Sequence, residues 1–128
     1  MKDRGSVAHI LLAEDEVLIA LMFQDALEVE GHRVSVAHDG IEALEVDEQD
    51  PAEVLVTDLA MPRMGGRELL ERLRQRRPDL PALVVSGYPV EFEIATEITV
   101  LLPKPVSPKV LAQRLAQLLE DRSTVREF

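Results

Sequence analysis

Five polar residues stand directly after short apolar runs of the sequence, and their types suit metal-assisted phosphoryl chemistry. They are three carboxylates, one hydroxyl and one ammonium, namely Glu14, Asp15, Asp58, Ser86 and Lys104. Carboxylates that gather in one place repel one another unless a cation joins them. Mg²⁺ binds carboxylate oxygens, and Lys104 offers a second positive charge. An aspartate beside such cations can attack a phosphoryl group and form an aspartyl phosphate.

The apolar runs that precede these residues predict five β-strands, most of them buried on both faces. The expected strands cover residues 10–13, 33–37, 54–57, 82–85 and 98–102. Amphipathic patterns between the strands predict helices over residues 16–30, 40–47 and 67–77. A shorter helix is expected within residues 90–97, and a last helix after Ser107 as N-cap and Pro108 as first helical residue.

Strands and helices therefore alternate five times, which predicts an α/β fold with a doubly wound, five-stranded parallel sheet. Sheets of this kind bind ligands beyond the carboxyl ends of their strands. We expect the five polar residues to converge at that edge. The single domain is expected to span residues 9–121, with an N-terminal tail over 1–8 and a polar C-terminal tail over 122–128 that frays.

Composition excludes several other classes of function. The 128 residues include 24 acidic and 14 basic ones, a net charge of −10, which disfavours direct nucleic-acid binding and an anionic membrane surface. Because there is no cysteine, disulfides, thiolate zinc sites and a cysteine nucleophile are excluded. The longest apolar run, residues 17–23, is far shorter than the ~20 residues of a membrane span. We expect a cytoplasmic protein without membrane insertion.

Four motifs, in this order, resemble the receiver domains of two-component response regulators, a chemotaxis-regulator-like family. They cover residues 11–16 (LLAEDE), 57–66 (TDLAMPRMGG), 84–88 (VVSGY) and 102–105 (LPKP). The similarity extends from about Ile10 to Leu119. It implies a flavodoxin-like (βα)5 fold with strand order 2-1-3-4-5.

The resemblance implies a phosphorelay role centred on Asp58. This residue would accept a phosphoryl group from a histidine kinase or a histidine phosphotransfer protein. Lys104 would pair with the phosphoryl oxygens, and Ser86 would move toward them after transfer. The peptide bond between Lys104 and Pro105 is typically cis in such domains. The domain would support its own phosphotransfer and autodephosphorylation without being a conventional enzyme.

The resemblance also implies a cofactor, Mg²⁺ or Mn²⁺. Asp15 and Asp58 would be direct ligands of the ion, and Glu14 would hold it through water. The backbone carbonyl of Ala60 would be a further ligand. The same acids have a simpler use, because Asp15 and Glu14 could cap the first helix and Asp58 could cap a turn. Ser86 could likewise be a turn hydroxyl, and Lys104 a solvated lysine.

The sequence departs from the family pattern in its switch region. Leu101 occupies the position where the family usually has a rotating Tyr or Phe, three residues before the lysine. Tyr88 is the nearest aromatic substitute, and its simpler interpretation is a half-buried loop residue. The segment from Ser86 to Lys104 is about four residues shorter than the family pattern. We therefore expect a short or irregular fourth helix and an altered readout surface around that helix and the fifth strand.

Three hypotheses follow for the function. The first is a phosphorylation-switched receiver that acts on a downstream protein target, with a homodimer as an open alternative. The second is a pseudo-receiver that binds partners without phosphorylation. The third is an aspartate-nucleophile phosphatase, which would need a second acid where Ala60 stands. No output domain follows the last helix, so we expect either a stand-alone receiver or a domain excised from a hybrid kinase.

The remaining charged and imidazole side chains are interpreted as surface groups. The three histidines lack the spacing of metal ligands and are expected at the surface without a chemical role; they are His9, His32 and His38. The basic run of the third helix is expected to form its solvated face; it consists of Arg72, Arg74, Arg76 and Arg77.

Overall fold

A computed structural model describes residues 7–87 and 98–126 of the chain. Its centre is a parallel sheet of five strands in the order β2-β1-β3-β4-β5. The strands are β1 (His9–Ala13), β2 (Arg33–Ala37), β3 (Val54–Asp58), β4 (Ala82–Ser86) and β5 (Thr99–Pro103). The sheet and its strand order confirm the fold expected from the sequence.

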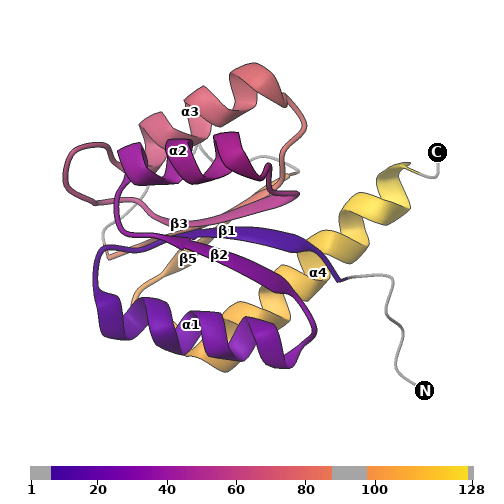
Figure 1. The fold of residues 1–128 in the computed structure, drawn as a ribbon. Coiled ribbons are helices and arrows are strands. Elements are labelled where there is room, and N and C mark those ends of the chain that lie inside the picture. Colours follow the sequence, from indigo (N-terminus) through magenta and orange to yellow (C-terminus); the bar gives the residue numbers. More distant parts are fainter. Residues whose placement is uncertain (1–6, 88–97, 127–128) are drawn as a thin grey trace.

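Four helices among the described residues cover both faces of this sheet. They are α1 (Val17–Val29), α2 (Gly40–Gln49), α3 (Gly66–Arg76) and α4 (Pro108–Arg126). Figure 1 shows α1 and α4 on one face and α2 and α3 on the other. Ser107 caps α4 as expected, since its hydroxyl accepts a hydrogen bond from the Val110 amide at 3.1 Å. Gly31 follows α1 with a φ of 100°, the left-handed conformation that commonly ends a helix.

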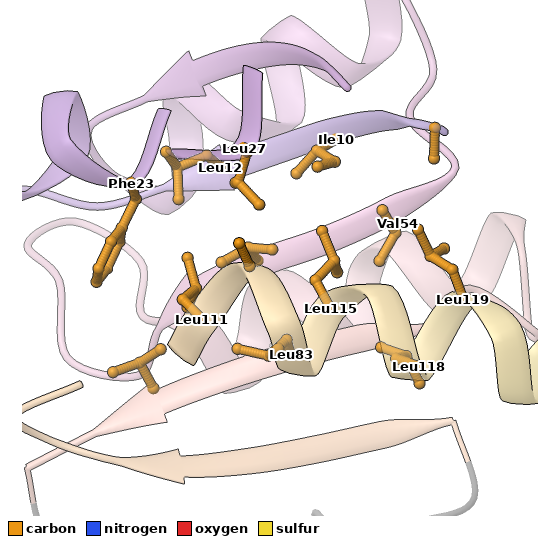
Figure 2. Close-up of a cluster of buried hydrophobic side chains, with 14 of the residues drawn as sticks. Ile10, Leu12, Phe23, Leu27, Val54, Leu83, Leu111, Leu115, Leu118 and Leu119 are labelled. Carbon is orange, nitrogen blue, oxygen red and sulfur yellow. The ribbon is translucent and has the colours of Figure 1, made fainter. Parts of the chain in front are cut away.

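Side chains of the central strands point alternately into two hydrophobic cores. Ile10 and Leu12 of β1 face α1 and α4, where they pack with Phe23, Leu111 and Leu115 (Figure 2). The intervening side chains of the strands pack against α2 and α3; they include Leu11, Leu55 and Val84. This double burial is the reason why the strand sequences read as continuous apolar runs.

The last helix is longer than the sequence predicted. The last helix continues to Arg126, past residue 122 where the polar tail was expected to begin. After Pro108 no proline or glycine interrupts this stretch, so polarity alone does not end the helix. The short helix expected within residues 90–97 lies outside the described residues. Within the described part of the chain, no helix is both long and apolar enough to cross a membrane.

Two of the three histidines are buried, so their assignment to the surface was wrong. His9 is 5% exposed, and its Nδ1 and Nε2 lie 3.1 Å from the Pro51 carbonyl oxygen and 2.8 Å from the Ser35 hydroxyl. His32 is 7% exposed, and its Nδ1 accepts a hydrogen bond from the Ala8 amide at 3.1 Å. Burial of each ring is tolerated because at least one of its nitrogens has a hydrogen-bond partner within the protein.

The basic run of α3 is also less solvated than predicted. Arg74 is half-buried and donates hydrogen bonds to the carbonyl oxygens of Leu80 and Ile98. Arg77 donates from Nη2 to the buried Asp47 carboxylate at 2.8 Å. Arg76 also forms an ion pair with Asp47, at 3.8 Å. Three of the four arginines therefore join α3 to neighbouring segments, because their long side chains reach buried acceptors that charge patterning does not reveal.

Candidate functional site

Three carboxylates converge at the carboxyl ends of β1 and β3, as the sequence predicted. The two strands are neighbours, with Ala13 paired to Thr57 at the end of their ladder. Glu14 and Asp15 follow β1, and Asp58 is the last residue of β3. One carboxylate oxygen of each lies within 4.8 Å of those of the other two. The geometry therefore concentrates negative charge at one point of the sheet edge.

The three acids differ strongly in their exposure. Glu14 is 1% exposed and Asp58 is 5% exposed, whereas Asp15 is open to solvent. Burial raises the pKa of the Glu14 carboxyl, and the charges of Asp58 and Asp15 also raise it. A hydrogen bond from the Glu16 amide to Glu14 Oε2 at 3.1 Å partly opposes this rise. A cation at this cluster would relieve the same repulsion.

Lys104 supplies a positive charge from the end of β5, two strands away from β3 in the sheet. It directly follows β5, and its Nζ lies 2.8 Å from Asp58 Oδ2. Partial burial tends to lower the pKa of this ammonium. The hydrogen bond to Asp58 and the charges of Asp58 and Glu14 outweigh that effect, so the pKa is raised. Lys104 therefore remains charged at neutral pH and partly compensates the carboxylates.

The backbone after each strand fixes the direction of these side chains. The Lys104 amide donates to the Ser86 carbonyl oxygen at 2.8 Å, and the peptide bond between Lys104 and Pro105 is cis. Ser86 ends β4 and is buried. The Ala60 amide donates to Asp58 Oδ1 at 3.3 Å, so the Asp58 carboxylate has a partner on each oxygen. The site is therefore assembled from residues in or directly after the ends of four strands, β1, β3, β4 and β5, at the same edge of the sheet.

Gly66 allows the chain to return closely past Asp58. A Cβ on Gly66 would lie 2.3 Å from the Asp58 carbonyl oxygen, closer than real Cβ atoms approach backbone. The Gly66 amide also donates to the Leu59 carbonyl oxygen at 2.9 Å, which closes the loop after β3. Only glycine leaves the space for this approach.

The capping alternative is resolved differently for the two acids after β1. The N-cap position of α1 is Glu16, and its side chain makes no capping hydrogen bond. Asp15 is therefore not the N-cap. Glu14 does bind the Glu16 amide, so part of its carboxylate supports the start of the helix. This local use leaves its other oxygen for the acidic cluster.

The expected switch residues are Ser86, which ends β4, together with Leu101 and Tyr88. Leu101 lies in β5, is half-buried and packs against the core beneath α2 and α3. Its aliphatic side chain has no hydroxyl with which to make a hydrogen bond. Tyr88 lies outside the described residues.

Sequence reasoning missed a contribution from the loop between β2 and α2. His38 Nδ1 lies 3.1 Å from the Glu14 carbonyl oxygen. The Asp39 carboxylate binds the guanidinium of Arg63, which lies in the loop after β3. One signal was readable, because Asp39 and Glu42 have the spacing of a capping box. The Glu42 amide does bind Asp39 Oδ1, at 2.8 Å.

The chain is similar to proteins of two-component signalling. The family model described as Response regulator receiver domain matches residues 10–116. Sensor kinase CckA of Brucella abortus (strain 2308) is 38% identical over 125 residues, covering 92% of this chain and 13% of CckA. Response regulator MprA of Mycobacterium ulcerans is 34% identical over 115 residues, covering 87% of this chain. The chain spans half the length of MprA.

Solved structures agree with these sequence matches. The receiver domain of the hybrid histidine kinase CckA is 33% identical, with a TM-score of 0.74, over 87% of this chain and 98% of that one. A CheY-like receiver domain protein from Methanospirillum hungatei JF-1 is 26% identical, with a TM-score of 0.80. That similarity covers 92% of this chain and 98% of the other.

Proposed function

The chain belongs to the response regulator receiver domain family, and on that basis we propose that phosphorylation of Asp58 switches it between two signalling states. A receiver of two-component signalling is a phospho-accepting module and implies a histidine kinase as its partner. The observation that carries the proposal is the 2.8 Å contact between Lys104 Nζ and Asp58 Oδ2, beside a cluster of three carboxylates. This contact supports the proposal, because an aspartate nucleophile needs compensating positive charge beside it.

The donor set of the cluster fits a hard divalent cation. All three side chains offer carboxylate oxygens, and one oxygen of each lies within 4.8 Å of the others. Mg²⁺ and Mn²⁺ prefer such ligands, completed by water and by a substrate phosphate. Asp15, Asp58 and the Ala60 carbonyl would hold the ion, with Glu14 acting through water. When bound, the ion supplies charge compensation for phosphoryl oxygens.

Asp58 acts as the nucleophile in the proposed transfer. One of its carboxylate oxygens forms a bond to phosphorus while the bond from phosphorus to the donor's histidine nitrogen breaks. The leaving imidazole nitrogen keeps the bonding electron pair and takes up a proton from solvent. Lys104 pairs its ammonium with the developing charge on the phosphoryl oxygens. Hydrolysis by water later restores the Asp58 carboxylate, so the reaction resets a switch and does not process a metabolite.

Readout of the phosphorylated state would begin at Ser86. Its hydroxyl can donate a hydrogen bond to a phosphoryl oxygen, which would draw the end of β4 toward Asp58. The surface that changes would lie around β5 and the segment before it, where Leu101 replaces the usual aromatic residue. Tyr88 is the proposed substitute. A downstream protein or a second copy of the chain would bind that surface.

The proposal is tested by incubation of the chain with Mg²⁺ and acetyl phosphate, followed by intact-mass measurement. We expect one added phosphoryl group on the wild type and none on Asp58→Ala or Asp58→Asn. Asp79→Asn, at an exposed position after α3, is the matched control and should be phosphorylated normally. Removal of Mg²⁺ with EDTA should abolish the adduct.

A different result would favour the pseudo-receiver alternative. If the folded wild type gains no phosphoryl group from acetyl phosphate or from a phosphorylated histidine kinase, Asp58 is not an acceptor. The aliphatic residue at position 101, in place of the usual aromatic one, would then support a receiver that is not switched by phosphorylation. The chain would bind its partners in a single state.

A further inference from the structure

The segment that leads from β2 into the first residue of α2, residues 38–40, contacts both halves of the acidic site. The ladder between β1 and β3 ends at Ala13 and Thr57. Beyond that point the chain after β1 carries Glu14 and Asp15, and the 59–65 loop after β3 carries Ala60. Residues 38–40 supply hydrogen bonds to each of these segments. They therefore bridge the two sides where the strand ladder no longer does.

The contact on one side is made by His38. Its Nδ1 lies 3.1 Å from the Glu14 carbonyl oxygen. Because a carbonyl can only accept, Nδ1 carries the proton and donates it. The Glu14 amide donates in turn to the Ala37 carbonyl oxygen at 3.0 Å. Both backbone groups of Glu14 are thus held by the end of β2 and the residue after it.

The contact on the other side is made by Asp39 with Arg63. The Arg63 Nε donates to Asp39 Oδ2 at 2.9 Å, and its Nη2 donates to Oδ1 at 3.2 Å. Arg63 has a φ of 68° and is the one non-glycine residue with positive φ among those that the structure describes. A side chain disfavours this left-handed conformation. The paired hydrogen bonds to a carboxylate that also caps α2 therefore hold the 59–65 loop in an otherwise unfavourable shape.

Gly40 makes the same connection through the backbone. Its amide donates to the Met64 carbonyl oxygen at 3.0 Å. A Cβ on Gly40 would lie 2.5 Å from that oxygen and 2.6 Å from the Met64 Cβ. Met64 is itself buried. The 59–65 loop therefore rests directly on the first residue of α2, with no room for adjustment there.

We infer that residues 38–40 set the distance between Glu14 and the 59–65 loop, and that His38 and Arg63 are positioning residues of the acidic site. The inference rests on the proposed function, because a divalent cation would need oxygens from both sides at once. Mg²⁺ tolerates little variation in the placement of its ligands. Loss of either connection should therefore weaken the affinity for the ion even where the fold is retained.

Arg63→Gly separates this role from a purely structural one. Glycine accepts the positive φ without strain, so the melting temperature should stay close to that of the wild type. The guanidinium is lost, so the Kd for Mg²⁺ alone, measured by titration calorimetry, should rise roughly 10-fold. The control is Arg72→Ala, at an exposed position of α3, which should leave the Kd unchanged. Alanine replaces arginine there because glycine would destabilise the helix.

Two further variants test each side of the bridge. His38→Ala removes the donor to Glu14 and should also weaken Mg²⁺ binding, whereas His38→Asn retains an N–H donor and should restore much of the affinity. Asp39→Asn retains an oxygen that can cap α2 but lacks the charge for Arg63. Combined with Arg63→Gly it should cost no more affinity than either change alone, because the two residues act through one contact.

Hydrogen exchange of the metal-free protein gives a readout independent of the ion. In Arg63→Gly the Gly40 amide should exchange faster than in the wild type, because its acceptor on Met64 is no longer held in place. Wild-type Mg²⁺ affinity in both Arg63→Gly and His38→Ala would overturn the inference and leave the proposed function intact. If Arg63→Gly and His38→Ala lower the melting temperature as well as the affinity for Mg²⁺, the two residues have a structural role only. A wild type that binds no Mg²⁺ would overturn the proposed function itself.

Discussion

Lys104 Nζ lies 2.8 Å from Asp58 Oδ2, although the two residues are 46 positions apart in the sequence. Asp58 ends β3 and Lys104 follows β5, with β4 between them. The contact therefore depends on the pairing of three strands. It also gives the buried Asp58 carboxylate a counter-charge from within the chain.

The variant Lys104→Met should be phosphorylated slowly on Asp58. It keeps most of the side-chain volume but loses the ammonium that faces Asp58 and the incoming phosphoryl oxygens. Loss of one such charged donor is expected to lower the rate of phosphorylation by roughly 100-fold or more. The rate is measured by intact mass over time with acetyl phosphate and Mg²⁺. Lys109→Met, at an exposed position of α4, is the control, and an unchanged rate in Lys104→Met would contradict the assigned role.

The variant Glu14→Gln should be more stable than the wild type without metal. Burial raises the pKa of the Glu14 carboxyl, so its charged form is unfavourable in the folded state at neutral pH. Removal of the charge should increase the free energy of unfolding by about 0.5–2 kcal/mol in EDTA. Mg²⁺ should then stabilise the wild type more than the variant.

Urea unfolding with and without Mg²⁺ measures both effects of Glu14→Gln. Glu45→Gln, an exposed change on α2, serves as the control for loss of one negative charge. A lower stability of Glu14→Gln in EDTA would show that the buried negative charge of Glu14 does not destabilise the folded protein.

The variant Gly66→Ala should be destabilised at the site. Its Cβ would come within 2.3 Å of the Asp58 carbonyl oxygen, so either α3 or the end of β3 must shift. We expect a loss of about 1–3 kcal/mol in the free energy of unfolding, together with slower phosphorylation. Gly87→Ala is the matched control, because the nearest atom to its added Cβ, Lys104 Cδ, is 3.9 Å away. Equal stability of the two variants in urea would contradict the close approach.

His32 should make stability depend on pH. Burial lowers the pKa of His32 below its usual value of 6.5, although the charge of Glu30 partly opposes this. Its Nδ1 accepts the Ala8 amide proton, so protonation would remove the acceptor. The lowered pKa means that the unfolded chain binds the proton more readily. The stabilising contribution is therefore complete above pH 6.5 and is lost as pH falls toward the folded pKa.

Unfolding of the wild type and His32→Asn at several pH values tests this dependence. Asparagine keeps an oxygen that can accept from the Ala8 amide but does not titrate. The free energy of unfolding of the wild type should fall relative to the variant below pH 6.5, by at most about 1.4 kcal/mol per pH unit. Parallel pH profiles of the two proteins would exclude the effect.

The approximate strand positions could be predicted from the sequence, because apolar runs mark them. The five polar residues could be selected because each follows one of these runs. Apolar runs buried on both faces mark β1, β3 and β4, and residues that follow parallel strands must emerge at one edge. Glu14, Asp15 and Asp58 meet for this reason. The histidines were misjudged because their burial depends on acceptors elsewhere in the chain, such as the Pro51 carbonyl oxygen for His9.

The sequence by itself determined the fold class and which residues gather at the sheet edge, since hydrophobic periodicity marks the elements and their βα alternation implies parallel strands. Tertiary structure alone decided how these residues are held. The partnership of Asp39 with Arg63 joins two loops through side chains whose reach no pattern encodes. The close passage of Gly66 past Asp58 likewise exists only once β3 and α3 have packed. Such contacts depend on distances of a few ångströms between separate loops, and only the packed sheet sets those distances.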